Sequence, residues 1–365
     1  MAISDYEIPL PGMYIQDELD ARGWSQRDLA FILGIEEPAL NKIIRGKTGV
    51  SGEMSKSLAK AFDIDADFFA NLQKAYDFAH AREPDPSVER RAALQRIYPI
   101  REMIKRGWID KDNLETQLAQ FLRTSNPHVA YAAKKTDSGA DISPLQYAWF
   151  HRVMQMADQI SSVPYSEGAL RESLPRLREL MIEPEAIRHV PRMLMECGVK
   201  YIVVEGLSGG KIDGVCTWNQ GLPIIGMSLR FDRIDNFWFV LRHEIEHVLQ
   251  RHGHNGPIID VDTQETANDE LISSQEKIAN AAAAEFCLPR NDFDSFVARK
   301  APFFSERDVI GFARRMRVHP GIVVGHIQAR TQKWDFLRRY LVKVREFLLP
   351  GAFADGWGQV ASVSL

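Results

Sequence analysis

The sequence predicts a mainly α-helical chain of the α+β class that is divided into several domains. Three observations support this prediction. Short amphipathic helical patterns fill residues 1–80, β-rich runs stand between residues 199 and 230, and helical patterns dominate again to about residue 347. A chain of 365 residues is also long for a single hydrophobic core. We expect four blocks: residues 1–80, a linker and helical middle region over 81–195 with a polar loop at 134–141, a domain over 196–300, and a C-terminal helical region and tail over 301–365.

The composition is typical of a globular protein in a reducing compartment. Hydrophobic residues make up 45% of the chain and charged residues 26%, with a formal net charge of −4. Three cysteines, Cys197, Cys216 and Cys287, have no paired spacing, which disfavours a disulfide framework and a thiolate zinc cluster. The first residues lack the basic start and the apolar core of a signal peptide, so we expect none, and the sequence has no apolar run of the ~18–20 residues that cross a bilayer. We therefore expect a cytoplasmic protein with no membrane partner.

Residues 25–62 show the pattern of a helix, a tight turn and a second helix. Ser25, with a carboxylate three positions later, begins the first helix with a capping-box pattern. Gly34 marks the turn, because glycine readily adopts the left-handed backbone that ends a helix. Second and third helices are expected over 36–45 and 53–62. The side chains expected to be buried are Leu29, Ile32, Leu33, Leu40, Ile43, Ile44, Met54, Leu58 and Phe62.

This order of helices resembles the five-helix DNA-binding domain of phage repressors, and residues 68–77 resemble the end of HigA-type antitoxin regulators. The resemblance implies binding to double-stranded operator DNA, with 36–45 as the recognition helix. Residues 13–80 hold 8 Lys and Arg against 11 Asp and Glu, but residues 38–62 hold 5 basic side chains and one acidic one, the local patch that phosphates require. A helical bundle that makes only protein contacts is the alternative. The side chains predicted to contact DNA are Gln26, Ala39, Asn41, Lys42, Arg45 and Lys47.

An H-E-x-x-H motif lies within a helix predicted over 236–251, with His243 and His247 as its histidines. Residues four positions apart share one helix face, so both imidazoles can bind one metal ion. Glu244 lies beside the first histidine and can serve as general base without being a ligand. Zn²⁺, one per chain, is the metal we expect. Glu246 is expected to point to solvent, and a helix that carries two histidines by chance is the alternative.

A third ligand is expected from the next helical pattern, over 275–289, because catalytic zinc usually has three protein ligands. Its E-x-x-A-N motif runs from Glu276 to Asn280, and small residues and Leu-Pro follow. This pattern resembles the third-ligand helix of the ImmA/IrrE family of metallopeptidases. The resemblance implies that Glu276 completes the metal site, and Asn280 is expected to support the ligands from one turn away. Glu285 is the less favoured alternative ligand.

Three short β-rich runs precede the motif helix, at 201–204, 214–218 and 223–229, and predict a small three-stranded sheet. Residues 211–218 and 228–239 resemble the strands and entry loop of HigA-type regulators fused to an ImmA/IrrE domain, which implies a gluzincin-like fold. We expect the strand at 224–229 to pair with an extended substrate peptide.

The leading hypothesis is a DNA-binding transcriptional regulator or antitoxin with a zinc-dependent endopeptidase domain that hydrolyses a peptide bond in a regulatory protein partner. The alternatives are a non-proteolytic antitoxin that binds operator DNA and a toxin around a structural or sensory metal site, and a peptidase whose N-terminal domain only recruits proteins. An intact Glu244 favours catalysis, since a structural site needs no such carboxylate. A homodimer is expected because repressor-type domains often occupy two half-sites. His252 and His254 are either neighbours of the site or solvated loop side chains.

Overall fold

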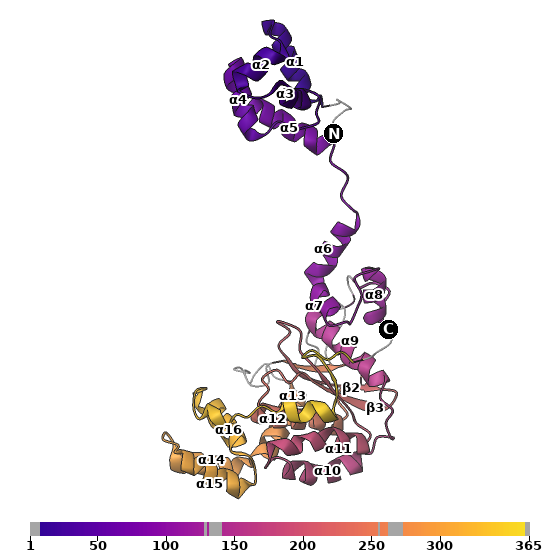
Figure 1. Cartoon of the computed structure of the whole chain (residues 1–365). Helices are drawn as coiled ribbons and strands as arrows, with labels where there is room; N and C mark the ends of the chain where they lie inside the picture. The colour runs from indigo at the N-terminus through magenta and orange to yellow at the C-terminus, as the bar shows by residue number, and fades with distance from the viewer. Residues whose placement is uncertain (1–7, 128–129, 131–140, 255, 262–272, 362–365) are drawn as a thin grey trace. The chain divides into compact units, whose positions relative to one another are not determined.

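The computed structural model describes residues 8–127, 130, 141–254, 256–261 and 273–361 (Figure 1). The chain divides into two compact units, Met1–Val88 and Glu89–Leu365. The boundaries expected at residues 195 and 300 fall inside the second unit, and the three expected boundaries stay predictions. Most of the polar segment 134–141 lies outside the described residues.

Five helices form the described part of the first unit. Ser25 begins the second helix with the predicted capping box, because its Oγ accepts the Asp28 N–H at 3.2 Å while its own N–H donates to Asp28 Oδ2 at 2.8 Å. Gly34 ends that helix with a φ of 68°. The helices are α1 (Pro11–Arg22), α2 (Gln26–Leu33), α3 (Glu37–Ile44), α4 (Gly52–Phe62) and α5 (Asp67–Ala79).

The core of the first unit confirms the predicted apolar faces of α3 and α4 but not that of α2. Leu29 is buried as expected, whereas Ile32 is 46% exposed and Ala30 takes its place in the core. Residues 29–33 are all apolar, so hydrophobicity alone could not decide which face of this two-turn helix turns inward.

The second unit is organised around a five-stranded sheet with the order β4-β2-β3-β1-β5. β1 runs parallel to β3 and β5, and β2 runs antiparallel to β3 and β4. The three predicted strands are present. The sheet also contains two strands that were not predicted, β4 and β5, which are too short to show an alternating pattern. The strands are β1 (Lys200–Val204), β2 (Ile212–Asn219), β3 (Leu222–Met227), β4 (Ile258–Val261) and β5 (Phe353–Asp355).

The position of β3 contradicts the expectation that residues 224–229 receive a substrate strand. β3 lies in the interior of the sheet, with β2 hydrogen-bonded along one edge and β1 along the other. Its backbone groups are therefore already paired, and strand addition needs an open edge. Within the described sheet, β4 and β5 are the outer strands.

The sheet lies between two helices. α9 (Pro144–Asp158) packs against β1 and β3, and α12 (Ile234–Leu249) packs against β2 and β3. Side chains alternate accordingly: Val215 belongs to the core on the α9 side, whereas Cys216 belongs to the core on the α12 side. The predicted helix over 236–251 therefore exists, begins two residues earlier and lies in a central position.

Further helices surround these layers. Buried contacts tie the C-terminal segment to the middle region, since the Asp355 carboxylate accepts from Arg152 Nε at 2.6 Å and from Trp108 Nε1 at 2.7 Å. No helix among the described residues is long and apolar enough to cross a membrane. The remaining α-helices are α6 (Ser87–Ile97), α7 (Ile100–Lys105), α8 (Leu114–Phe121), α10 (Glu167–Glu179), α11 (Val190–Glu196), α13 (Ser274–Cys287), α14 (Arg290–Lys300), α15 (Glu306–Met316), α16 (Pro320–Thr331) and α17 (Arg345–Leu348).

Candidate functional site

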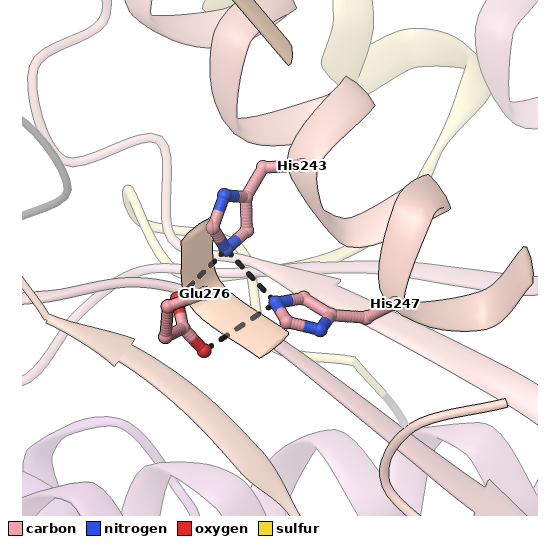
Figure 2. Close-up of side chains that lie close together, drawn as sticks. All are labelled: His243, His247 and Glu276. Carbon is pink, nitrogen blue, oxygen red and sulfur yellow. Dashed lines mark hydrogen bonds and ion pairs between the residues drawn. The ribbon is translucent and has the colours of Figure 1, made fainter. Parts of the chain in front are cut away.

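α12 directs two histidines at one point. His243 and His247 lie one helical turn apart, and their Nε2 atoms are 3.0 Å apart (Figure 2). Both side chains are fully buried. Ile245 and Val248 on the same helix are buried in the core beside the sheet, which fixes the rotation of α12 and so the direction of both imidazoles.

Glu276 on α13 faces both histidines (Figure 2). Its Oε2 lies 3.2 Å from His243 Nε2, and its Oε1 lies 3.5 Å from His247 Nε2. Ser273 fixes the start of α13, because its Oγ accepts the Glu276 N–H at 3.2 Å. The three side chains each offer one ligand atom within 4.8 Å of the others, so two nitrogens and one oxygen converge as a divalent metal requires.

The alanine run of α13 lets that helix lie directly beside α12. Ala279 and Ala283 are completely buried at the contact. Glu285 is exposed and accepts the Arg290 N–H at 2.9 Å, so the structure does not bring this rival carboxylate to the histidines. The Oδ1 of Asn280 is shielded from solvent and has no hydrogen-bond partner among the described residues, and the expected role of Asn280 in supporting the ligands stays a prediction.

The carboxylate of Glu244 is completely buried against the backbone of β2. A Cβ atom added to Gly214 would lie 1.9 Å from Glu244 Oε1, which is far inside van der Waals contact. Glycine is therefore the residue at this point of β2 that leaves room for the Glu244 side chain. The sequence carries a signal for this contact, a glycine within a strand, but not the identity of the approaching group.

His252 lies beside the cluster of His243, His247 and Glu276, whereas His254 lies away from it. The Nδ1 of His252 is 2.9 Å from the Nδ1 of His247. The exposed ring of His254 stacks on Trp218, with 4.2 Å between ring centroids. Of the two roles left open for these residues, His252 is the site neighbour.

The expectation that Glu246 points to solvent is wrong. Glu246 is buried and accepts from Arg242 Nη2 at 2.6 Å and from Gln250 Nε2 at 2.7 Å. Burial raises the pKa of its carboxyl, but the hydrogen bonds from Gln250 and Arg242 outweigh burial and leave the pKa below its usual value. The helices α10, α13 and α16 also pack against α12, so faces of α12 that a lone amphipathic helix would expose are covered here.

The side chains predicted to contact DNA gather around α3. Leu40 and Ile43 bury the inner face of this helix. Asn41 is half-buried, and its Nδ2 donates to Gln26 Oε1 at 3.0 Å, which joins α3 to the start of α2. The exposed members of the predicted set are Ala39, Lys42, Arg45 and Lys47.

Family models match the two parts of the chain that carry these sites. A helix-turn-helix model matches residues 15–69, and a model of the IrrE N-terminal-like domain, Peptidase M78, matches residues 200–324. The chain belongs to the helix-turn-helix proteins that carry an IrrE N-terminal-like domain. The helix-turn-helix match contains α2 and α3, and the IrrE N-terminal-like domain contains α12 and α13 together with β1–β4.

Similar proteins match about a fifth of this helix-turn-helix protein. Virulence-associated protein A′ of Dichelobacter nodosus is 38% identical over 76 residues, which are 20% of this chain and 66% of that protein. Virulence-associated protein I of the same organism is 30% identical over 79 residues, 21% of this chain and 73% of that protein. A Pseudomonas aeruginosa protein solved in complex with its 18-bp operator DNA is 36% identical over 20% of this chain and 77% of its own, with a TM-score of 0.19.

Proposed function

We propose that this DNA-binding regulator is a zinc-dependent endopeptidase that cleaves a regulatory protein partner. The observation that carries the proposal is the convergence of His243 Nε2, His247 Nε2 and one carboxylate oxygen of Glu276. Two imidazoles and one carboxylate are the donor set of catalytic zinc sites, which keep one position open for water or substrate. When bound there, zinc supplies Lewis acidity for the attack of water on an amide carbonyl.

Glu244 is the proposed general base. Its position directly after His243 on α12 keeps it beside the ligands but outside the converging set. During hydrolysis its carboxylate takes a proton from the attacking water and passes that proton to the amide nitrogen as the C–N bond breaks. The products are a new carboxylate and a new amine, and Glu244 is again ionised.

The edge strand β4 is the place where we expect an extended substrate segment to bind. β4 is paired with β2 on one side and is the outermost strand in the sheet order. β2 in turn carries Gly214, which contacts Glu244. A peptide added along β4 would therefore run beside the strand that supports the general base.

Operator binding by α3 is the second part of the proposed function. Lys42 is exposed on this short helix, and Arg45 and Lys47 are exposed after it, so their charges are available to phosphates or base edges. We propose that the chain binds its operator as a homodimer and that the peptidase domain acts on a repressor, a toxin or another copy of this chain.

Metal content and hydrolysis test the enzymatic part of the proposal. Purified wild-type protein should contain about one zinc per chain. The Glu276→Gln variant should lose the metal, and Glu244→Gln should keep it but lose cleavage of a mixed peptide library followed by mass spectrometry. Glu285→Gln is the matched control, since Glu285 lies on the same helix and is exposed.

The same experiment separates the enzyme from a non-proteolytic antitoxin. Zinc bound by His243, His247 and Glu276 without any Glu244-dependent cleavage would favour a structural or sensory metal site. Absence of zinc in wild-type protein after reconstitution would refute both interpretations of the metal centre.

A further inference from the structure

His252 occupies a position that the proposed chemistry does not yet use. It lies in the turn after α12, and its Nδ1 is 2.9 Å from the Nδ1 of His247. The other ring nitrogen of His247, Nε2, is the one that faces His243 and Glu276. The His247 ring is therefore held between the metal-binding point on one side and His252 on the other.

The backbone of His252 is fixed at both of its polar groups. Its N–H donates to the carbonyl of His247 at 2.9 Å, and its carbonyl accepts from Trp218 Nε1 at 2.7 Å. The next residue, Gly253, has a φ of 83°, and a Cβ there would lie 2.8 Å from the Cys216 carbonyl oxygen. The turn is thus closed onto β2, so the backbone that carries the His252 ring is held beside His247.

We propose that His252 is a positioning residue for the metal ligand His247. An imidazole that binds a metal through Nε2 carries its proton on Nδ1, and here that N–H would donate to the Nδ1 lone pair of His252. Such a bond selects the tautomer of the ligand and fixes the orientation of its ring. The proposal rests on the metal site of the proposed function, and the histidine takes the role that a carboxylate or carbonyl oxygen has in many metal sites.

His254 provides an internal comparison. It belongs to the same loop and is also aromatic and titratable, but it is exposed and its ring stacks on Trp218 rather than on a ligand. We therefore expect removal of the His254 ring to alter the loop without removing the contact between His252 and His247.

Zinc affinity tests the proposal, measured by competition with a chromogenic chelator on the full-length protein. His252→Ala should weaken zinc binding by about 10- to 100-fold. His252→Asn should retain most of the affinity, because the amide Oδ1 occupies the place of the imidazole Nδ1 and can accept the same hydrogen bond. His254→Ala should bind zinc as wild type does. Circular dichroism of each apo variant establishes that it is folded.

Three outcomes would overturn the proposal. Wild-type affinity in His252→Ala would show that the contact does not support the ligand. Equal losses in folded His252→Ala and His252→Asn would show that the accepted hydrogen bond is not the cause. Failure of the wild-type protein to bind zinc would instead refute the proposed metal site on which the inference depends.

Discussion

α3 and α12 both carry side chains with predicted functions, but they place these side chains in opposite surroundings. On α3 and directly after it, Lys42 and Arg45 are exposed to solvent, and the helix is anchored by its inner face. On α12, His243, Glu244 and His247 are fully buried between the sheet and neighbouring helices. The fold therefore determines the geometry of the functional side chains more strongly on α12 than on α3.

This difference affects how sensitive each group is to substitutions of its neighbours. A buried side chain is held in place by every neighbour that packs on it. A substitution that fills its space or removes one partner therefore has a large effect on stability. An exposed cation keeps its rotameric freedom and becomes ordered only when it binds a partner. Substitutions around α12 should accordingly cost more free energy than substitutions around α3.

The largest effect is expected at Gly214. A Gly214→Ala substitution places a methyl group where Glu244 Oε1 now lies, so overpacking should lower the free energy of unfolding by about 1–3 kcal/mol. Urea unfolding of the full-length protein measures this change. In a Glu244→Ala background the same methyl group has space, and the cost should fall close to zero.

This double-mutant cycle isolates the contact between the two residues. An equal cost of Gly214→Ala in both backgrounds would mean that the glycine is required by the strand itself and not by the carboxylate. Gly221→Ala is an unsuitable control because Gly221 has a positive φ; Gly52→Ala on α4 has open space around it and ordinary backbone.

An intermediate effect is expected on α3. Lys42→Ala combined with Arg45→Ala should weaken binding to an operator fragment by about 10-fold, or about 1.4 kcal/mol. The salt dependence of the affinity should also become shallower, by about one unit of slope for each phosphate that the variant no longer neutralises. Fluorescence anisotropy over a range of salt concentrations measures both quantities.

A control with the same charge change makes this experiment specific. Lys105 and Lys111 are exposed in the second unit, and their double alanine variant should bind operator DNA as wild type does. Equal weakening in both double variants would indicate an effect of net charge, and unchanged affinity in the α3 variant would argue against this helix as the DNA contact.

The smallest effect is expected at the start of α2, the helix that supports α3. Ser25→Ala removes one side of the capping box and should cost about 1 kcal/mol of local stability. Hydrogen exchange at the amides of α2 should accelerate accordingly. Ser57→Ala on α4 should have little effect, since its hydroxyl only donates back to the Glu53 carbonyl within the helix.

The sequence predicts those parts of the site for which the pattern lies within a single helix, α12 for the two histidines and α13 for Glu276. The spacing of His243 and His247 places both imidazoles on one face of α12 whatever surrounds that helix. Glu276 could be named because its own helix carries a recognisable motif, and the structure brings its carboxylate to both histidines. The mainly helical fold and the three longest strands followed from local patterns in the same way.

The remaining features depend on contacts between segments that no local pattern connects. Gly214 meets Glu244, and His252 meets Trp218, only because α12 lies across β2. Glu246 is buried because α12 is covered on faces that a two-layer arrangement would leave open. β5 is only three residues long, so its pairing with β1 cannot be predicted from its local sequence and depends on the tertiary fold.

Because the second unit includes the buried carboxylate of Asp355, its fold can be completed only much later during synthesis than that of the first unit. The sheet acquires β5, and Arg152 its counter-charge, only after residue 355 has been made. The helices of the first unit contain all of their own core within residues 8–88. At about 5–20 residues per second, the ribosome needs roughly 15–50 s to travel from residue 88 to residue 355. A nascent chain can therefore present a finished helix-turn-helix well before the proposed metal site has a complete scaffold.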